Sequence, residues 1–208
     1  MPAFKIAGTM ANIPLILASS SRYRRELLDR LGLAYTCVSP EVDETPLAGE
    51  SPVQLCARLA RLKAEAVAKT NPHAVVIGSD QVCDLDGQAL GKPHTFEKAV
   101  AQLMSMQGKR VVFHTAVCVL SPVLPPQETI SDTVITMRAL TEETVRDYVE
   151  REKSFDCAGS AKIERLGIAL MESVSSDDPT SLIGLPLMRV TTMLTLAGIP
   201  PVKGLTVN

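Results

Sequence analysis

Aromatic residues make up only 3% of this 208-residue chain, although 46% of its residues are hydrophobic. The core must therefore be built mainly from aliphatic side chains. The cysteines are odd in number, scattered and without a Cys-x-x-Cys pair, and they are Cys37, Cys56, Cys83, Cys118 and Cys157. This pattern argues against a disulfide framework or a structural zinc site, and it indicates a reduced, cytoplasmic protein.

The chain also lacks a strong net charge and a long apolar run. Its formal net charge of −2 argues against a broad nucleic-acid-binding surface but permits a local basic pocket. No apolar run reaches transmembrane length, so we expect no membrane partner. Residues 5–21 have the outline of a weak signal peptide, but its cleavage would remove the segment with the clearest structural pattern, so we reject that interpretation.

The chain shows no internal repeat and no low-complexity linker, and residues 1–12 show no clear pattern. We therefore predict an N-terminal extension over residues 1–12 and a single domain over residues 13–208. Whether Met1 or Met10 is the natural start stays open at this point.

Several familiar catalytic motifs are missing. There is no Gly-x4-Gly-Lys-Ser/Thr phosphate loop and no strand-linked Gly-x-Gly-x-x-Gly motif. The three histidines, His73, His94 and His114, lie far apart in the sequence, which disfavours a zinc site or a Ser-His-Asp triad. Arg58 and Arg61 follow Cys56 at spacings that do not form a Cys-x5-Arg phosphate loop. The remaining chemistry is that of cations and carboxylates.

The segment that best indicates a ligand site begins with a short apolar run over residues 15–18, typical of a buried strand. Three serines, 19–21, follow it, and Arg22, Arg24 and Arg25 then occupy the first turn of a predicted helix. Cations oppose the helix dipole at this end, so a bound anion such as a polyphosphate would explain them. The alternative is a solvated basic helix start beside an ordinary serine cap.

The rest of the chain alternates between predicted strands and helices. Further strands are expected at residues 35–39, 74–80, 110–120, 129–137 and 168–174, with an exposed loop at 121–126. Further helices are expected at residues 51–69, 95–107 and 141–151, and in a last segment ending near residue 198. Residues 84–87 are predicted to form a hairpin turn. The order predicts an α/β domain around a mixed sheet.

Three charged residues stand out against this background. Asp80 ends the predicted strand at 74–80, and ligands bind at the carboxyl ends of strands in α/β sheets. Lys63 lies in an apolar helical stripe, so its ammonium group either reaches back to solvent or points into a cleft. Glu44 belongs to a proline-bounded acidic loop that is either simply solvated or holds a metal ion near the phosphate site.

Together, these cations and carboxylates suit phosphoryl chemistry, in which cations and a divalent ion stabilise oxygen charge and a carboxylate activates water. The residues in this set are Arg24, Arg25, Lys63 and Lys92 on one side and Asp43, Glu44 and Asp80 on the other.

At this point the chain resembles a known family. The matching runs are Leu-Ala-Ser-Ser-Ser-Arg-Tyr-Arg-Arg at 17–25, Val-Asp-Glu at 42–44, Gly-Ser-Asp-Gln-Val at 78–82, Gly-Lys-Pro at 91–93, Cys-Ala-Gly-Ser at 157–160 and Ile-Gly-Leu-Pro-Leu at 183–187. They resemble the Maf family of nucleotide pyrophosphatases, from about residue 13 to 200. The resemblance implies a mixed twisted sheet with flanking helices and a deep cleft between two lobes, as in Maf and ITPase-like proteins. It also implies dependence on Mg²⁺ or Mn²⁺, and often a homodimer.

The resemblance also implies roles for individual residues. Asp80 would be the general base for water attacking the α-phosphorus, and Glu44, with Asp80, would lie near the metal ion. The residues that would hold the triphosphate are Ser19, Arg24, Arg25, Lys63 and Lys92. The products would be a nucleoside monophosphate and pyrophosphate.

Tyr23, Gln81 and Glu164 resemble the branch of the family that acts on 7-methyl-GTP. The branch that acts on dTTP and UTP has Asp-Thr in place of Asp80-Gln81 and a glutamine in place of Glu164. This chain departs from the 7-methyl-GTP branch in two places, because that branch often has Trp at Tyr23 and Gly at Arg165.

The chemistry agrees with the assignment to the 7-methyl-GTP branch. The Glu164 carboxylate can accept hydrogen bonds from guanine N1 and N2, and the Tyr23 ring can gain about 0.5–2 kcal/mol from a cationic base. Without the resemblance, Glu164 would be a surface acid and Tyr23 a packing residue. Two alternative functions are a pyrophosphatase for another nucleotide and a nucleotide-binding regulator linked to septum formation.

Overall fold

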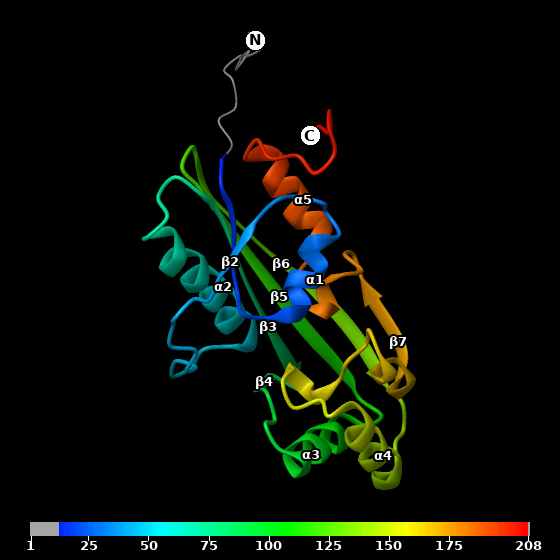
Figure 1. Cartoon of the computed structure of the whole chain (residues 1–208). Coiled ribbons are helices and arrows are strands. Elements are labelled where there is room, and N and C mark those ends of the chain that lie inside the picture. Colours follow the sequence, from blue (N-terminus) through cyan, green and yellow to red (C-terminus); the bar gives the residue numbers. More distant parts are fainter. Residues whose placement is uncertain (1–12, 208) are drawn as a thin grey trace.

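A computed structural model describes residues 13–207, so the predicted extension over residues 1–12 lies outside the described part (Figure 1). The strands are β1 Leu15–Ala18, β2 Thr36–Val38, β3 Val75–Leu85, β4 Gln88–Leu90, β5 Arg110–Ser121, β6 Leu124–Met137 and β7 Met171–Ser176. The helices are α1 Arg22–Asp29, α2 Pro52–Ala68, α3 Phe96–Met106, α4 Glu142–Glu152 and α5 Leu187–Leu196. Short 3₁₀ helices span Ala158–Ser160, Leu166–Leu170 and Ser181–Ile183.

The strands form one mixed sheet in the order β2-β1-β3-β5-β6-β7, with β4 paired to β3. β1 lies parallel to β2 and β3, and the other pairs are antiparallel. The prediction of an α/β protein around a mixed sheet is therefore confirmed. Within residues 13–207, no helix is both long enough and apolar enough to cross a membrane.

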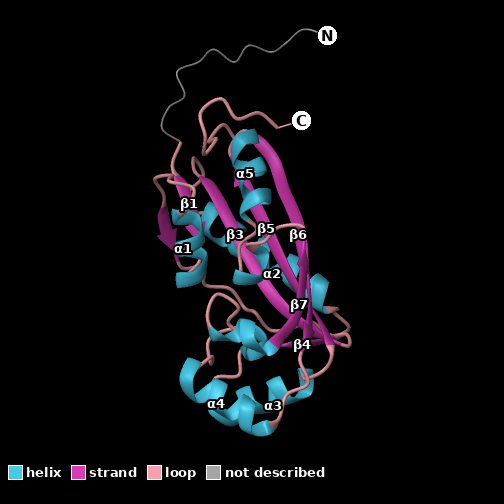
Figure 2. Cartoon of the chain, turned by 90° about the vertical axis from the view of Figure 1, so that its right-hand side faces the viewer, coloured by secondary structure: helices cyan, strands magenta, loops and turns pink. Residues whose placement is uncertain are grey.

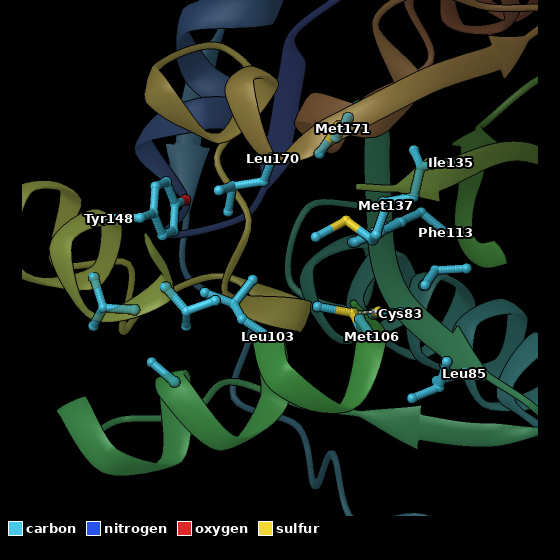
Figure 3. Close-up of a cluster of buried hydrophobic side chains, with 14 of the residues drawn as sticks. Cys83, Leu85, Leu103, Met106, Phe113, Ile135, Met137, Tyr148, Leu170 and Met171 are labelled. Carbon is cyan, nitrogen blue, oxygen red and sulfur yellow. Dashed lines mark hydrogen bonds between the residues drawn. The ribbon is translucent and has the colours of Figure 1, made fainter. Parts of the chain in front are cut away.

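One face of the sheet carries two apolar clusters at opposite ends of the long strands. At one end α1 and α5 cover Leu17, Ile77 and Val119, and at the other end α3 and α4 cover Phe113 and Ile135 (Figures 2 and 3). Between the two clusters the same face bears buried polar side chains, namely Ser79, Thr115, Ser131 and Thr133. The apolar clusters therefore define two lobes, and the polar belt separates them.

Helix α2 covers the opposite face of the sheet at unusually close range. Its Ala60 and Ala64 lie directly over Gly78 of β3, where an added Cβ would approach the Ala60 carbonyl oxygen to 2.3 Å. A residue with a side chain would force the helix away from the strand. Gly78 thus sets the short distance from which side chains of α2, including Lys63, reach β3.

The prediction that Asp80 ends its strand is wrong. β3 continues to Leu85, because its antiparallel ladder with β5 runs without a break from Val76 to Asp84. On the other edge of β3 the β1 ladder stops at Gly78 and the β4 ladder begins at Cys83. Asp80 therefore lies in the middle of a strand, at a gap between two neighbouring strands.

Two other boundaries also differ from the predictions. β6 begins at Leu124 and includes two prolines expected in a loop, which it tolerates because β7 pairs only from Thr133 onward and leaves this end of β6 as an edge. β7 begins at Met171 rather than at residue 168. The preceding residues form a 3₁₀ turn, in which the backbone N–H of Gly167 donates to the Lys162 carbonyl.

Candidate active site

A cleft of about 670 Å³ opens over the gap in the edge of β3. Every predicted site residue except Arg25 lines it. The predicted residues that the structure brings together here are Ser19, Tyr23, Arg24, Glu44, Lys63, Asp80, Gln81, Lys92 and Glu164. These residues come from both lobes, so the cleft exists only because the folded chain brings the lobes together.

Arg25 is exposed on α1 and does not line the cleft. Each residue of an α-helix is turned by about 100° from the one before it, and this turn carries the Arg25 side chain past the part of α1 that faces the cleft. The structure therefore gives no support to the prediction that Arg25 binds phosphate.

Local hydrogen bonds hold the segment from Ser19 to Arg24, which we call the serine–arginine corner. Ser21 caps α1 by accepting a hydrogen bond from the Arg24 backbone N–H at 3.4 Å, and Ser19 Oγ accepts one from the Ser21 N–H at 3.1 Å. Arg24 Nε donates to the Gly184 carbonyl at 2.8 Å. Its terminal guanidinium nitrogens have no hydrogen-bond partner among residues 13–207, so they can bind an anion in the cleft.

The turn that receives Arg24 is itself well anchored. Gln81 Nε2 donates to the carbonyl oxygens of Ser181 and Leu182 at 2.9 and 3.0 Å, and Ser79 Oγ donates to that of Gly184 at 3.1 Å. The buried Asp178 accepts backbone hydrogen bonds at the start of α5, which follows this turn. The Gln81 side chain thus holds the turn against β3 through these two hydrogen bonds.

Lys63 points into the cleft rather than back to solvent, and only 6% of the residue is exposed. Its Nζ lies 2.6 Å from Asp80 Oδ1 and 2.8 Å from Glu44 Oε1. Desolvation raises the pKa of Glu44, but Lys63, assisted by Lys92 and Arg24, outweighs it and holds this pKa below its usual value. The acidic loop therefore presents an ionised carboxylate to the cleft.

Lys92 lies in the linker between β4 and α3. It lines the side of the cleft that belongs to the lobe of α3 and α4, which we call the second lobe. The next residues hold this linker in place, since Pro93 is buried and the His94 N–H donates to the Phe155 carbonyl at 3.2 Å. His94 adopts a positive φ of 62°, which is uncommon for a residue other than glycine.

The other end of the cleft is formed by Tyr23 and the segment after α4. Tyr23 Oη donates to Asp156 Oδ2 at 3.3 Å, and the guanidinium of Arg22 lies 4.7 Å from the centre of the Tyr23 ring. Lys162 Nζ pairs with Asp156 Oδ1 at 3.0 Å. Glu164 lines the same end, where desolvation raises the pKa of its carboxyl group.

Asp156 and Lys162 are cleft residues that the sequence reasoning missed. Lys162 is only 5% exposed, between two apolar residues and two positions before Glu164. A lysine within such an apolar segment is the same signal that drew attention to Lys63. No comparable signal in the sequence distinguishes Asp156 from a surface acid.

Two carboxylates of the cleft, Glu44 and Asp80, offer oxygen atoms of the kind that a divalent ion such as Mg²⁺ takes as ligands. No group of three His, Cys, Asp or Glu side chains that could hold a metal ion occurs within residues 13–207. Glu44 and Asp80 nevertheless lie near each other, since both contact Lys63 Nζ. Mg²⁺ commonly binds one or two protein carboxylates and takes its remaining oxygen ligands from water and substrate phosphates.

Fold and cleft together define an α/β protein with a cationic, carboxylate-bearing groove that suits a polyphosphate ligand. The chain belongs to the Maf family, since the family model described as "Maf-like protein" matches residues 14–197. The resemblance inferred from the sequence motifs is thereby confirmed.

Named relatives are similar to this chain over most of its length. The chain is 54% identical over 194 residues to the 7-methyl-GTP pyrophosphatase of Polaromonas sp. strain JS666, covering 93% of this chain and 89% of the relative. It is 53% identical over 190 residues to the protein of the same name from Bordetella pertussis, covering 91% and 95%. Among solved structures, the Ham1 protein of Staphylococcus aureus aligns with a TM-score of 0.46 and 17% identity over 61% of this chain and 72% of that one.

Proposed function

We propose that this protein is a metal-dependent nucleoside triphosphate pyrophosphatase that converts 7-methyl-GTP to 7-methyl-GMP and pyrophosphate. The observation that carries the proposal is that one cleft holds the serine–arginine corner and the Asp80–Lys63–Glu44 cluster. The names of relatives that are 53–54% identical to this chain support the same substrate.

The phosphate tail would bind to the corner and the lysines. Ser19 and the N-terminus of α1 offer hydrogen-bond donors and a positive dipole end, while Arg24, Lys63 and Lys92 offer positive charge. These groups stabilise the negative charge that builds on the leaving pyrophosphate as the α–β bond breaks.

Asp80 would take the proton from the attacking water. Lys63 holds Asp80 Oδ1, and Oδ2 has no donor among residues 13–207, so Oδ2 can accept that proton. Glu44 and Asp80 would hold the divalent ion. When bound, that ion would act as a Lewis acid toward the phosphate oxygens.

The base would bind at the other end of the cleft. An ionised Glu164 can accept hydrogen bonds from guanine N1 and N2, and Tyr23 offers an aromatic face to the cationic 7-methylguanine ring. Gln81 would contribute indirectly, through the turn that it supports. The five free cysteines favour a cytoplasmic location, and the family resemblance favours a homodimer.

The test is a nucleotide panel of 7-methyl-GTP, GTP, dTTP and UTP, assayed with Mg²⁺ or Mn²⁺ and again with EDTA. We expect pyrophosphate release to be fastest from 7-methyl-GTP and to be lost with EDTA. Asp80→Asn should abolish turnover, whereas Asp86→Asn, the same change in the exposed β3–β4 turn, should not. Full turnover by the Asp80 variant would overturn the assigned base, and binding without pyrophosphate release would favour a regulatory role.

A further inference from the structure

We propose that the Asp156–Lys162 ion pair is a specificity-determining element that balances the charge met by the nucleotide base. This inference rests on the proposed function and deepens it. Lys162 Nζ lies 3.0 Å from Asp156 Oδ1, and both residues line the cleft together with Tyr23 and Glu164.

The pair lies directly against the proposed base-binding residue. Asp156 Oδ2 accepts a hydrogen bond from Tyr23 Oη at 3.3 Å, and Lys162 Nζ lies 5.9 Å from the centre of the Tyr23 ring. A base stacked on Tyr23 would therefore be within reach of the charges on both side chains. Arg22 adds a third, exposed charge over the same ring.

The charges at this end of the cleft nearly cancel. Arg22 and Lys162 are cationic, and Asp156 and Glu164 are acidic. Methylation at N7 makes guanine cationic, whereas the base of GTP is neutral. Loss of one acidic side chain would therefore penalise 7-methyl-GTP more than GTP, and loss of one cation would do the opposite.

The backbone of Lys162 is held from two sides, so the side chain extends from a fixed position beside Tyr23, and Asp156 holds its ammonium group there. The Lys162 N–H donates to Tyr148 Oη at 3.0 Å, while that hydroxyl donates to the Ser160 carbonyl at 3.1 Å. The Lys162 carbonyl accepts hydrogen bonds from the N–H groups of Arg165 and Gly167. Tyr148 is itself buried in the apolar cluster of the second lobe (Figure 3).

A purely structural role for the pair predicts a different result. If the ion pair only braced the segment after α4, its loss would slow the hydrolysis of every nucleotide to the same extent. The ratio of kcat/KM for 7-methyl-GTP to that for GTP separates the two roles, because both substrates carry the same triphosphate.

The experiment measures this ratio for Asp156→Asn, Lys162→Met and the double variant. We expect Asp156→Asn to lower the ratio about tenfold, Lys162→Met to raise it, and the double variant to return it toward the wild-type value. Asp147→Asn, which breaks an exposed ion pair with Arg151 on α4, is the matched control and should leave the ratio unchanged. Equal effects on both substrates, or shifts in the same direction for both single variants, would overturn the inference.

A second measurement separates this inference from the proposed reaction. The affinities for 7-methyl-GMP and GMP, measured by calorimetry, should follow the kinetic ratio. Asp156→Asn should therefore raise the dissociation constant of 7-methyl-GMP relative to that of GMP, and Lys162→Met should lower it. If the wild-type protein releases no pyrophosphate but the binding ratio shifts as expected, the reaction is wrong and the charge balance stands. If pyrophosphate is released and neither ratio shifts, the charge balance is wrong.

Discussion

The buried contacts of Lys63 predict that Asp80→Asn and Lys63→Met, two substitutions in the same ion pair, will lower the free energy of unfolding by unequal amounts. Lys63 Nζ contacts two carboxylates, Asp80 at 2.6 Å and Glu44 at 2.8 Å. Among residues 13–207, Asp80 has one ion-pair partner, which is Lys63. In Asp80→Asn the ammonium group keeps Glu44, and an amide oxygen can still accept its hydrogen bond. In Lys63→Met both carboxylates lose the cation, and Asp80 is almost fully buried.

The magnitudes follow from these contacts. Asp80→Asn weakens one hydrogen bond between charged groups, so we expect a loss of about 1–2 kcal/mol in the free energy of unfolding. Lys63→Met leaves a buried carboxylate without its cation, which lowers the free energy of unfolding by about 3–5 kcal/mol where the site is closed to water. Because Asp80 lines a cleft that is open to water, we expect a loss of about 3 kcal/mol, at the lower end of this range. The double variant has no unpaired Asp80 carboxylate, so its loss in the free energy of unfolding should be smaller than the sum of the losses in the single variants.

Urea unfolding at pH 7, with EDTA present so that no divalent ion binds the carboxylates, measures all three variants. The reasoning requires that Lys63→Met is the more destabilising single change and that the double variant is less destabilised than the sum. An equal or larger loss in Asp80→Asn, or strict additivity, would refute the geometry on which the assignment of the cluster rests.

Two further predictions concern α2 and the base-binding end of the cleft. Gly78→Ala should lower the free energy of unfolding by about 2–3 kcal/mol, because the new Cβ would meet the Ala60 carbonyl at 2.3 Å. Gly91→Ala, at a position with open space and an ordinary φ, should be nearly neutral, and thermal unfolding of both variants measures the difference. Desolvation raises the pKa of Glu164, so the KM for 7-methyl-GTP should rise on acidification at a pH above the usual glutamate pKa of 4.5. Glu164→Gln should lose this pH dependence, and an unchanged pH profile would contradict a role for its carboxylate in base binding.

Features that depend on a few neighbouring residues could be predicted from the sequence. Ser51, Thr95 and Thr141 each stand at the predicted start of a helix and cap it, accepting a hydrogen bond from a backbone N–H three residues later. Gly32 and Gly108 follow predicted helices with positive φ values of 65° and 66°. Such signals are local, because a cap or a left-handed residue acts within one helical turn.

The order of the short motifs indicated the family, and every predicted site residue except Arg25 lines the cleft, but the motifs did not show how these residues are arranged. The sequence left open whether Lys63 reached solvent or the cleft, and it predicted that Asp80 ended its strand. The fold decides both points, because β5, more than 25 residues away in the chain, extends β3 past Asp80. It also brings α2 against Gly78, so that Lys63 reaches Asp80.

Likewise, the sequence could not reveal that Asp156 and Lys162 meet Tyr23, since these residues are separated by more than 130 positions and come from different lobes. Residue types, caps and motif order are properties of short segments, so the sequence by itself determined the elements, the family and the candidate chemistry. Strand pairing and the packing of helices on the sheet join distant segments, so only the tertiary structure decided which charges share one cleft.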